Sequence, residues 1–576
     1  MSRNISLLSG KKDDKNSLFG KISVSPTEAS DSKLAAEYNL GVSTVHSTKS
    51  FYDFLSEDFK SKKAYVCSGS ACLCRGTQEV VADKLNQKFG EENVGEMICL
   101  GRCYENSAFN YNGENYSGDD INKLDQIIAG KHTSPAYTMK SFSNTSFLVE
   151  DKIFSSYDDF KDLLKVCFAT EKADLINTLK DSGLRGRGGA GFPTGMKWEF
   201  CKDQEVTTKY VVCNADEGDP GAFSDRYLLE EQPLKVLFGM VICAYIISSK
   251  QGFLYIRGEY PESITITNDA LAKLRELGLL GDNILGTGFD FDMNVVEGQG
   301  AYICGEETAL IASIEGRRAE VDVRPPFPVV EGLYKKPTVV NNVESLAAVA
   351  AIFKLGSEFY KNIGNGRSLG TKLISLDGYF NNPGLYEVDL GTPISFIIDE
   401  IGGGFNDSIK AIQIGGPLGG VVPVDILKTL TLDFEDFSEK GFLLGHASFV
   451  CIPKSFSAVE YAKHLFAFTE HESCGKCFPC RLGSTRGKEM LESALEKDQK
   501  FSENYRLQGK FVAGYVGTHG LAHALDSIIE AAELLKSEDD IRIVFAGGGA
   551  DRARLEKLVE ARDLSNVVMI PKQPKE

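Results

Sequence analysis

The segment that decides the fold of this chain is Tyr210-Val-Val-Cys-Asn-Ala-Asp-Glu-Gly-Asp-Pro-Gly-Ala-Phe223. Its first four residues predict an apolar strand, and an amide and three carboxylates follow at once. Open α/β sheets present their ligand-binding groups at the carboxyl ends of strands. Helical patterns alternate with further apolar strands through residues 150–350. The sequence therefore predicts a large α/β layer with a binding site at the end of this strand.

A glycine-rich segment, Leu184-Arg-Gly-Arg-Gly-Gly-Ala-Gly-Phe192, carries the spacing G-x-G-x-x-G. The dinucleotide-binding fingerprint needs a strand directly before the glycines, but Ala173–Leu184 has apolar residues at helical spacing. The ordinary Rossmann interpretation is therefore excluded. Successive glycine amides, with the charges of Arg185, Arg187 and Lys197 beside them, can instead cradle a phosphate. The alternative is a mobile surface loop.

Four cysteines in two loops predict a metal site. The two pairs are spaced C-x4-C and C-x3-C and are Cys67 with Cys72 and Cys99 with Cys103. A helix is predicted between the pairs, at Gln78–Phe89. Two thiolates for each iron suit a 2Fe-2S cluster. The alternatives are structural zinc, which usually takes tighter C-x2-C knuckles, and free thiols. Cys74 is a spare candidate for the second ligand.

A second set, Cys474, Cys477 and Cys480, is spaced C-x2-C-x2-C, which can bind three corners of a 4Fe-4S cube. No cysteine follows Cys480 in the sequence, so the fourth ligand is missing from the pattern. The alternatives are a cube with a non-cysteine ligand, a 3Fe-4S cluster, or a zinc site completed by His471. Cys451 lies in an apolar segment and is predicted to be a core residue.

Three further segments complete an uncommon series: Gly300-Ala-Tyr-Ile-Cys-Gly-Glu-Glu-Thr308, Arg324-Pro-Pro-Phe-Pro328 and Pro337-Thr-Val-Val-Asn-Asn342. In this order the segments resemble the NADH-oxidising 51-kDa flavoprotein subunit of respiratory complex I. They are also similar to its relatives in soluble NAD-linked hydrogenases, electron-bifurcating hydrogenases and formate dehydrogenases. The resemblance covers roughly residues 150–500. The first cysteine set resembles the thioredoxin-like ferredoxin unit of the 24-kDa subunit, which is fused to related flavoproteins.

The resemblance implies an NADH dehydrogenase (diaphorase) subunit that passes hydride from NADH to FMN and single electrons through iron–sulfur clusters to partner subunits. Hydride transfer to a flavin needs positioning rather than acid–base help, so no catalytic side chain is assigned. The positions that match the family's FMN contacts are Gly186, Gly188, Lys197, Asn214, Asp216, Tyr302, Gly305, Glu306, Asn341 and Asn342. Those that match its NADH contacts are Phe192, Phe200, Asp219, Glu307, Arg324 and Phe327. The implied cluster ligands are Cys67, Cys72, Cys99 and Cys103 for 2Fe-2S, and Cys474, Cys477 and Cys480 for 4Fe-4S.

Asp219 separates two branches of the family. Members from complex I commonly carry glutamate at this position, whereas this chain has Gly218-Asp-Pro-Gly221. Together with the fused thioredoxin-like unit, the aspartate favours a hydrogenase or bifurcating subunit. The implied partners are other subunits of a hydrogenase, formate dehydrogenase or complex I-type assembly. The alternative function is a remnant that binds FMN but has lost its exit 4Fe-4S cluster.

The pattern changes near residue 508. Tyr515–Leu521, Ile541–Gly549 and Arg554–Leu558 resemble the second half of a retaining glycosyltransferase of the two-Rossmann type. The segment stops before the region where that family places its paired glutamates for the sugar-nucleotide donor. Glycosyltransferase activity is therefore the least favoured function. A foreign segment that replaced the helix closing the 4Fe-4S site would explain the missing cysteine.

The predicted fold class is a multidomain α/β chain. Its expected regions are a weakly ordered leader (1–50), a thioredoxin-like 2Fe-2S domain (51–135), a Rossmann-like FMN/NADH-binding domain (150–350), a ubiquitin-like β-grasp module (368–435), an incomplete helical 4Fe-4S domain (440–507) and a truncated, glycosyltransferase-like α/β tail (508–576).

Composition excludes other classes. With 63 Lys and Arg against 81 Asp and Glu, the net charge of -18 argues against nucleic-acid binding. The longest apolar run, Val236–Ile247, is far shorter than the ~20 residues that span a bilayer, and predicts a buried helix. No signal peptide is apparent in residues 1–30. We expect a cytoplasmic location, where clustered cysteines more often bind metal than form disulfides.

Overall fold

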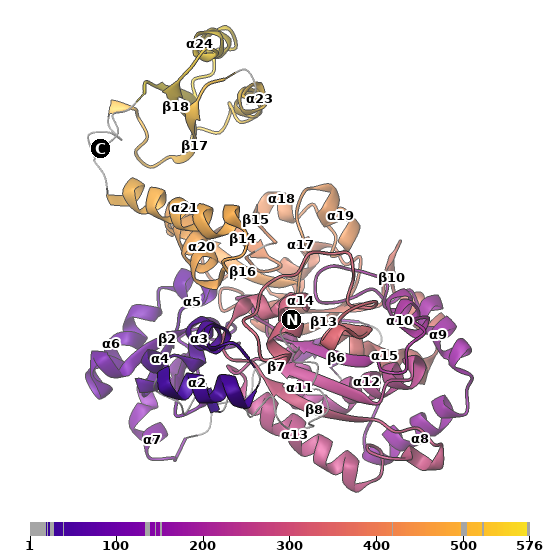
Figure 1. Ribbon diagram of the computed structural model, residues 1–576. Helices are drawn as coiled ribbons and strands as arrows, with labels where there is room; N and C mark the ends of the chain where they lie inside the picture. Colours follow the sequence, from indigo (N-terminus) through magenta and orange to yellow (C-terminus); the bar gives the residue numbers. More distant parts are fainter. Residues whose placement is uncertain are drawn as a thin grey trace. The chain divides into compact units, whose positions relative to one another are not determined.

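The computed structural model describes residues 19, 21–22, 28–38, 40–132, 139–143, 146–149, 153–417, 419–496, 504–520 and 524–572 (Figure 1). The chain divides into two compact units. The first comprises Met1–Ser455 and Glu472–Cys477, and the second comprises Phe456–His471 and Phe478–Glu576. The glycine loop, the strand Tyr210–Cys213 and the first cysteine set all belong to the first unit.

A four-stranded parallel sheet carries the predicted binding strand. Its members are β6 (Tyr210–Ala215), β7 (Gln251–Ile256), β8 (Asp292–Glu297) and β9 (Thr338–Asn342). Their order in the sheet is β8-β7-β6-β9, with every neighbouring pair parallel. The chain leaves β6 to form β7 on one side and later adds β9 on the other. A topological switch point therefore lies between β6 and β9, where open α/β sheets bind ligands.

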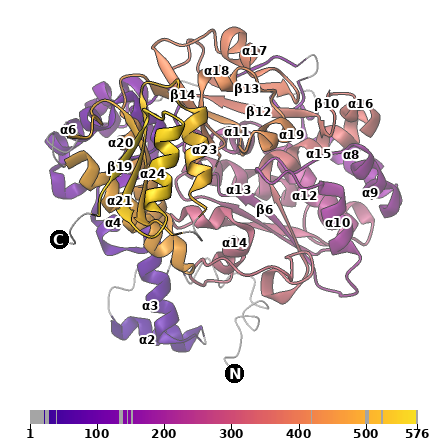
Figure 2. The same ribbon diagram turned by 90° about the horizontal axis from the view of Figure 1, so that it is seen from above.

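Helices cover both faces of this sheet. They include α8 (Tyr157–Phe168), α9 (Lys172–Asp181), α10 (Thr194–Lys202), α11 (Ser224–Glu231), α12 (Pro233–Ile247), α13 (Pro261–Glu276), α14 (Glu307–Ile314), α15 (Val343–Leu355) and α16 (Ser357–Lys361). Alternate residues of β6 enter two apolar cores: Val211 and Cys213 pack with α12 and α15, whereas Tyr210 and Val212 pack with α14. Figure 2 shows β6 between α14 and α12. The buried α12 confirms the helix predicted from Val236–Ile247.

The expected leader, residues 1–50, is more ordered than its polar composition predicts. It contains α2 (Glu28–Glu37) and α3 (Val42–Phe51). Leu34, Tyr38 and Val45 are buried in the same apolar core as α14. A few apolar side chains on one face are enough to attach such a helix to the domain. Residues 1–18 lie outside the described residues.

The first cysteine set lies in a small mixed sheet with the order β2-β1-β3-β4. Its elements are β1 (Ala64–Cys67), α5 (Ser70–Arg75), α6 (Gln78–Phe89), β2 (Val94–Met97), β3 (Phe109–Tyr111), β4 (Glu114–Tyr116) and α7 (Leu124–Ile128). β1 and β2 are parallel, and β3 and β4 form an antiparallel hairpin. The helix predicted between the two cysteine pairs is confirmed with the same bounds.

A six-stranded sheet extends beyond the expected module 368–435. Its order is β15-β14-β16-β12-β13-β5. The strands are β5 (Met139–Ser141), β12 (Thr371–Leu376), β13 (Gly384–Asp389), β14 (Ile409–Ile414), β15 (Gly420–Pro423) and β16 (Ser448–Pro453), with α17 (Ile394–Phe396), α18 (Val424–Leu427) and α19 (Phe434–Glu439) beside them in sequence. β16 is buried throughout because its apolar residues sit between β14 and β12. Cys451 in β16 is fully buried, so its prediction as a core residue is confirmed.

The second unit holds a helical part and a parallel sheet. The helices are α20 (Ala458–Glu472), of which Glu472 lies with the first unit, and α21 (Phe478–Glu496). The sheet elements are β17 (Phe511–Thr518), α23 (Asp526–Leu534), β18 (Ile541–Gly548), α24 (Arg552–Ala561) and β19 (Val567–Ile570). Ile529, Phe545 and Leu555 form a small core of their own. No helix in the described part of the chain is long and apolar enough to cross a bilayer.

Candidate functional site

The glycine loop connects α9 to α10, so a helix precedes it, as its sequence predicts. The Gly186 N–H donates to the Phe192 carbonyl at 2.9 Å, which closes the loop on itself. A Cβ at Gly188 would lie 3.0 Å from the Cβ of Asn342, the residue that caps α15. Glycine at this position therefore allows the loop backbone to lie against the first turn of α15.

The two arginines of the loop do not line a phosphate cradle. Arg187 is buried, and its Nη2 donates to Tyr360 Oη at 2.9 Å. Arg185 pairs with Glu435 at 2.6 Å. Both guanidinium groups attach the loop to segments far along the chain, which the local sequence cannot reveal. The predicted role of these arginines is wrong, and Lys197 is the one cation of the predicted three that remains at the site.

The polar residues after β6 form hydrogen bonds with their surroundings, and one buried carboxylate oxygen has no hydrogen-bond partner among the described residues. Asn214 Nδ2 donates to the Gly305 carbonyl at 2.9 Å, and Asn214 Oδ1 accepts the Asp216 N–H at 3.1 Å. Asp216 Oδ2 is buried and has no hydrogen-bond partner among the described residues. Burial raises the pKa of Asp216 well above its usual range, although Arg257 opposes this shift. Such an orphaned oxygen at a strand end is suited to a ligand's hydrogen-bond donor.

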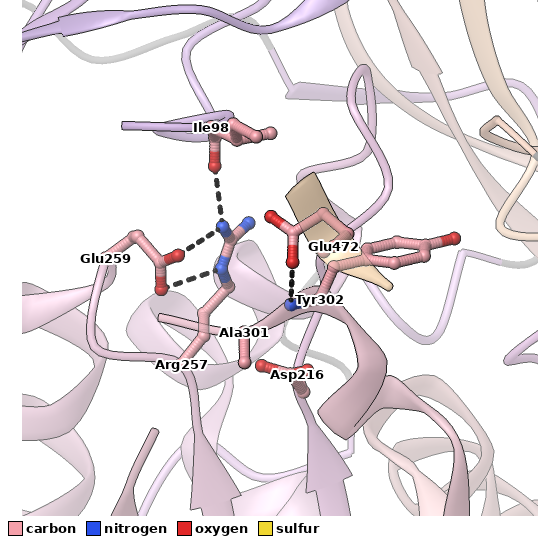
Figure 3. A pocket seen from close by; sticks show the side chains of 8 residues that line it. Ile98, Asp216, Arg257, Glu259, Ala301, Tyr302 and Glu472 are labelled. Atoms are coloured by element: carbon pink, nitrogen blue, oxygen red, sulfur yellow. Dashed lines mark hydrogen bonds and ion pairs between the residues drawn. The ribbon is translucent and has the colours of Figure 1, made fainter. Parts of the chain in front are cut away.

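A small hollow lies between the polar residues after β6 and the segment of Ile98, just before Cys99 of the first cysteine set (Figure 3). Arg257 Nη2 donates to the Ile98 carbonyl at 2.9 Å and pairs with Glu259 at 2.9 Å. Glu472 accepts the Tyr302 N–H at 2.8 Å on another side of the hollow. Together with Asp216, these acids place three carboxylates around one guanidinium group. The hollow is therefore strongly polar.

The paired glutamates at the start of α14 have different roles. Glu306 caps the helix, because its side chain accepts two backbone N–H groups of the first turn at 2.8 and 3.0 Å. Glu307 instead lies 2.8 Å from Arg324 and 3.6 Å from Lys197. The structure thus brings together the charged residues Lys197, Glu307 and Arg324, which lie far apart in the sequence. Lys197 Nζ also donates to the Val340 carbonyl at 3.0 Å.

Three phenylalanines at the predicted nicotinamide-nucleotide site are exposed. Phe192, Phe200 and Phe327 have exposed fractions of 43, 43 and 52%. The rings of Phe192 and Phe200 lie with their centroids 6.5 Å apart. Large exposed aromatic side chains usually mark a binding surface when they gather. Phe192 and Phe200 meet this condition, and Phe327 is exposed on the segment that follows Arg324.

The two asparagines at the end of β9 are partly used by the protein itself. Asn341 Oδ1 accepts the buried Trp198 Nε1–H at 2.8 Å. Asn342 Oδ1 accepts the Ser345 N–H at 3.3 Å and so caps α15, while its Nδ2 donates to Asp225 Oδ2 at 2.6 Å. Their positions at the switch point agree with the predicted site. Asp225 has no place in that prediction.

Asp219 lies where three segments meet. Tyr302 Oη donates to Asp219 Oδ1 at 2.7 Å, and His446 Nδ1 lies 3.6 Å from Asp219 Oδ2. A Cβ at Gly416 would lie 2.3 Å from Asp219 Cγ. The glycine turn after β14 therefore forms a wall of the site, a role that the sequence predictions miss because turn glycines indicate only a turn. His446 is missed because a lone histidine between Gly445 and Ala447 carries no motif.

The first cysteine set is brought together as predicted. Cys67, Cys72, Cys99 and Cys103 are all buried. The Sγ atoms of Cys99 and Cys103 are 3.5 Å apart, and this hydrogen bond lowers the pKa of Cys99 to about 6. Arg257 contributes to this shift, and a hydrogen bond with Cys72 lowers the pKa of Cys67. The same contacts and burial raise the pKa of Cys72 and of Cys103, so one thiol of each pair favours the thiolate form that binds metal.

Cys74 has different surroundings from these four cysteines. Burial raises its pKa strongly, with Asp377 adding to the shift. Of the second set, Cys474 is buried and its carbonyl accepts Arg318 Nη2–H at 2.8 Å. Cys477 is exposed, and Cys480 is half-buried in the first turn of α21.

These features define the class of the protein. A glycine loop, two asparagines and several carboxylates converge above the switch point of a parallel sheet, where α/β proteins bind nucleotides. The fold and the site therefore belong to a nucleotide-binding α/β protein, and buried thiols lie in the same unit.

Comparison with known proteins gives the family. Residues 179–351 match the Nuo51 FMN-binding domain, and residues 460–532 match the NADH-ubiquinone oxidoreductase-F iron-sulfur binding region. The chain is 45% identical to the NADP-reducing hydrogenase subunit HndC of Solidesulfovibrio fructosivorans over 58% of this chain and 68% of that one. It is 37% identical to the NAD-reducing hydrogenase HoxS subunit alpha of Cupriavidus necator over 78% of each. A crystal structure of an NAD+-reducing [NiFe]-hydrogenase in the H2-reduced state superposes with a TM-score of 0.74, at 26% identity over 91% of this chain and 88% of that one.

The chain belongs to the family of F-type (51-kDa) flavoprotein subunits found in NADH-quinone oxidoreductases and NAD-reducing hydrogenases, which confirms the predicted resemblance to the flavoprotein subunit. It is an NAD(H)-dependent oxidoreductase subunit with an FMN-binding domain and a 4Fe-4S-binding region. The iron–sulfur match runs to residue 532, past residue 508, where the glycosyltransferase-like segment is expected to begin.

Proposed function

We propose that the chain oxidises NADH at an FMN held above the carboxyl ends of β6 and β9, and passes the electrons through iron–sulfur clusters to partner subunits. The observation that carries the proposal is the meeting of the glycine loop with Asn342 at the switch point. The Cβ that Gly188 lacks would lie 3.0 Å from the Asn342 Cβ, so glycine lets the loop lie against Asn342 without displacing it. Bound FMN would accept hydride from NADH and release its two electrons singly.

The donors and acceptors at the site fit a phosphorylated flavin. The backbone N–H group of Gly188, with the Lys197 ammonium, suits the phosphate, while the Gly186 N–H closes the loop by donating to the Phe192 carbonyl. The buried, unpartnered Asp216 Oδ2 suits a hydroxyl or N–H donor of the ligand. The full set proposed to contact FMN is Gly186, Gly188, Lys197, Asn214, Asp216, Tyr302, Gly305, Glu306, Asn341 and Asn342.

NADH is proposed to bind on the outer side of the flavin. The exposed rings of Phe192, Phe200 and Phe327 offer faces on which an adenine can stack. Glu307 can accept hydrogen bonds from a ribose diol, and Arg324 can bind the phosphates. In the protein alone these two side chains pair with each other at 2.8 Å, so NADH binding exchanges this ion pair for ligand contacts. Asp219 is proposed to lie at the nicotinamide end.

Two iron–sulfur centres are proposed. The four buried thiols Cys67, Cys72, Cys99 and Cys103 support a 2Fe-2S cluster in a thioredoxin-like domain. Cys474, Cys477 and Cys480 are proposed to hold three corners of the 4Fe-4S cluster, with a ligand other than cysteine at the fourth. Iron and labile sulfide analysis tests this: about six iron atoms per chain support an intact relay. About two iron atoms support the alternative of a remnant without its exit cluster.

The remaining assignments are also proposals. The Asp219 position and the fused cysteine domain favour partner subunits of a soluble hydrogenase or bifurcating assembly over those of complex I, working in the cytoplasm. The six-stranded sheet is proposed to be the ubiquitin-like module, whose glycine turn at Gly416 forms one wall of the flavin site. The parallel sheet of β17, β18 and β19 is proposed to be a glycosyltransferase-like fragment without glycosyltransferase activity.

One experiment tests the main proposal directly. The full chain is reconstituted with FMN without oxygen, and flavin absorbance is followed while NADH is added. We expect flavin to remain bound after gel filtration and its absorbance to bleach on NADH addition. Protein that retains no flavin, or flavin that NADH does not bleach, contradicts the proposal.

A further inference from the structure

His446 connects the two sides of the proposed flavin site. It is buried in the loop before β16. Its Nε2 lies 3.2 Å from Asp225 Oδ2 and 3.2 Å from Asn342 Nδ2, while its Nδ1 lies 3.6 Å from Asp219 Oδ2. Asn342 is proposed to contact FMN and Asp219 to lie beside the nicotinamide. One imidazole ring therefore contacts a residue from each side.

The same residues form a group with the composition of a metal site. Glu217, Asp225 and His446 each place one possible ligand atom within 4.8 Å of the others. However, the oxygens of Glu217 already accept Ser224 Oγ–H at 3.0 Å and the backbone N–H groups of Asp225 and Arg226 at 3.0 and 3.1 Å. Glu217 thus caps the first turn of α11. Its oxygens are committed to these donors, so the positive charge in this group is supplied by the histidine ring.

The carboxylates around the ring favour its protonated form. Burial opposes the charge, but Asp225, Asp219 and Glu217 outweigh burial and raise the pKa of His446 well above 6.5. These three acids come from the loop after β6 and from α11. An imidazolium has two N–H donors, one for each of the two nearest carboxylates. The contact with Asp225 at 3.2 Å is a hydrogen bond between two charged groups, which is stronger than a neutral one, and the contact with Asp219 at 3.6 Å is an ion pair.

We propose that protonated His446 is a positioning residue that holds Asp219 directly and holds Asn342 through Asp225 Oδ2, which accepts from both side chains, so that NADH oxidation requires the proton on this ring. The proposal rests on the proposed function, because it needs FMN and NADH at this site. When His446 loses its proton, one ring nitrogen becomes an acceptor that faces a carboxylate. That carboxylate loses its cationic partner and is repelled by its acidic neighbours, so Asp219 is held by Tyr302 alone and its geometry changes. NADH oxidation therefore falls as the pH rises through the raised pKa.

The first test uses the FMN-free full chain and so does not depend on activity. Histidine-selective 15N NMR follows the ring of His446, assigned with His446→Gln, from neutral to alkaline pH. We expect a pKa above 6.5 in the wild type and a lower one in Asp225→Asn, which removes one of the charges that stabilise the proton. His132, which pairs with Asp120 at 2.6 Å outside the site, is the internal reference, and its ring signals should not change in this variant. A His446 pKa at or below 6.5 overturns the proposal.

The second test compares pH profiles of NADH oxidation with a small dye as acceptor, using FMN-loaded protein. In the wild type we expect kcat/KM to fall about tenfold per pH unit above the His446 pKa. In His446→Gln we expect a kcat about tenfold lower and no such alkaline limb. In Asp225→Asn the alkaline fall of kcat/KM should begin at a lower pH. This variant therefore tests the proposal independently if the glutamine variant does not fold. His132→Gln is the matched control and retains the wild-type profile.

The two proposals fail in different ways. A His446→Gln protein that binds FMN and keeps the wild-type alkaline limb overturns the role of His446 but leaves the proposed function intact. Wild-type protein that binds no FMN, or whose flavin NADH does not reduce, overturns the proposed function itself. The NMR titration still decides the charge of His446 in that case.

Discussion

Glu307 is the residue whose substitution best separates NADH binding from FMN binding. Its carboxylate faces Arg324 and Lys197 rather than the strand ends. In Glu307→Gln we expect KM for NADH to rise about tenfold, because an amide is a weaker acceptor for the ribose, while flavin content stays near the wild-type value. The measurements are NADH–dye kinetics and flavin absorbance per chain. Equal losses of flavin and activity would assign Glu307 to the FMN contacts instead.

A buried ion pair elsewhere in the first unit gives a prediction about stability. Lys372 in β12 and Glu344 in α15 form an ion pair with both side chains fully buried, and Glu344 also accepts the Leu373 N–H at 3.0 Å. Lys372→Met leaves a carboxylate buried without its cation, which should cost about 3–5 kcal/mol in the free energy of unfolding. Urea unfolding monitored by fluorescence measures the loss.

The matched control for that prediction is an exposed ion pair. Lys273 and Glu276 on α13 lie 2.9 Å apart with 44 and 68% of their side chains exposed. Lys273→Met should change the unfolding free energy by less than about 1 kcal/mol, because solvent screens the pair. Similar losses for the two lysine variants would contradict the explanation by burial.

At the scale of single elements, the glycine loop packs so closely against the first turn of α15 that a change in one affects the other. Gly188→Val places a branched side chain where even a Cβ lies 3.0 Å from Asn342. Either the loop or the helix cap must then move, and such overpacking costs about 1–3 kcal/mol. We expect FMN binding to weaken about tenfold or more, measured by flavin fluorescence titration.

A glycine outside the site provides the control for this substitution. A Cβ at Gly41 meets only side-chain atoms at 3.5 and 3.6 Å, which is ordinary contact. Gly41→Ala should therefore keep the wild-type affinity for FMN. If Gly188→Val also keeps it, the loop does not hold the flavin phosphate.

For the whole molecule, electron transfer from the flavin to a partner can be interrupted while the reaction of NADH with the flavin continues. Cys477→Ala removes one of the three ligands proposed for the 4Fe-4S cluster. We expect electron transfer to a protein partner to be abolished, while NADH-dependent reduction of a small dye continues at the wild-type rate. The assay pairs the dye with the partner subunits. Loss of dye reduction would mean that this region also supports the flavin site.

Local patterns predicted much of the fold. The helix before the glycine loop, the helix Gln78–Phe89 and the buried helix within Val236–Ile247 all follow from periodicity over short windows. Pairings between distant segments could not be predicted in this way. β5 is an edge strand that pairs with β13 some 240 positions later, as in Tyr386 with Lys140, and three residues carry too little pattern to reveal it.

The same limit applies to the candidate site. Family motifs located the loop glycines, Asn214, Asp216 and the paired asparagines, because each belongs to a dense local pattern. Arg187 looked like a phosphate ligand only because its partner Tyr360 is remote in the sequence. His446 reaches Asp225 across more than two hundred residues, and only the folded chain brings the two together.

The buried guanidinium of Arg257 has a consequence for the enzyme in dilute solution. Its Nη2 donates to the Ile98 carbonyl, next to Cys99, and its Nη1 donates to the Glu217 carbonyl at 2.5 Å, in the loop after β6. The domain with the four buried thiols and the FMN-binding domain are thereby fastened within one polypeptide rather than across a dissociable subunit boundary. Their contact is intramolecular, so its occupancy does not depend on protein concentration. Electron exchange between the flavin and the 2Fe-2S cluster proposed for this domain should therefore keep the same first-order rate constant at nanomolar and micromolar enzyme.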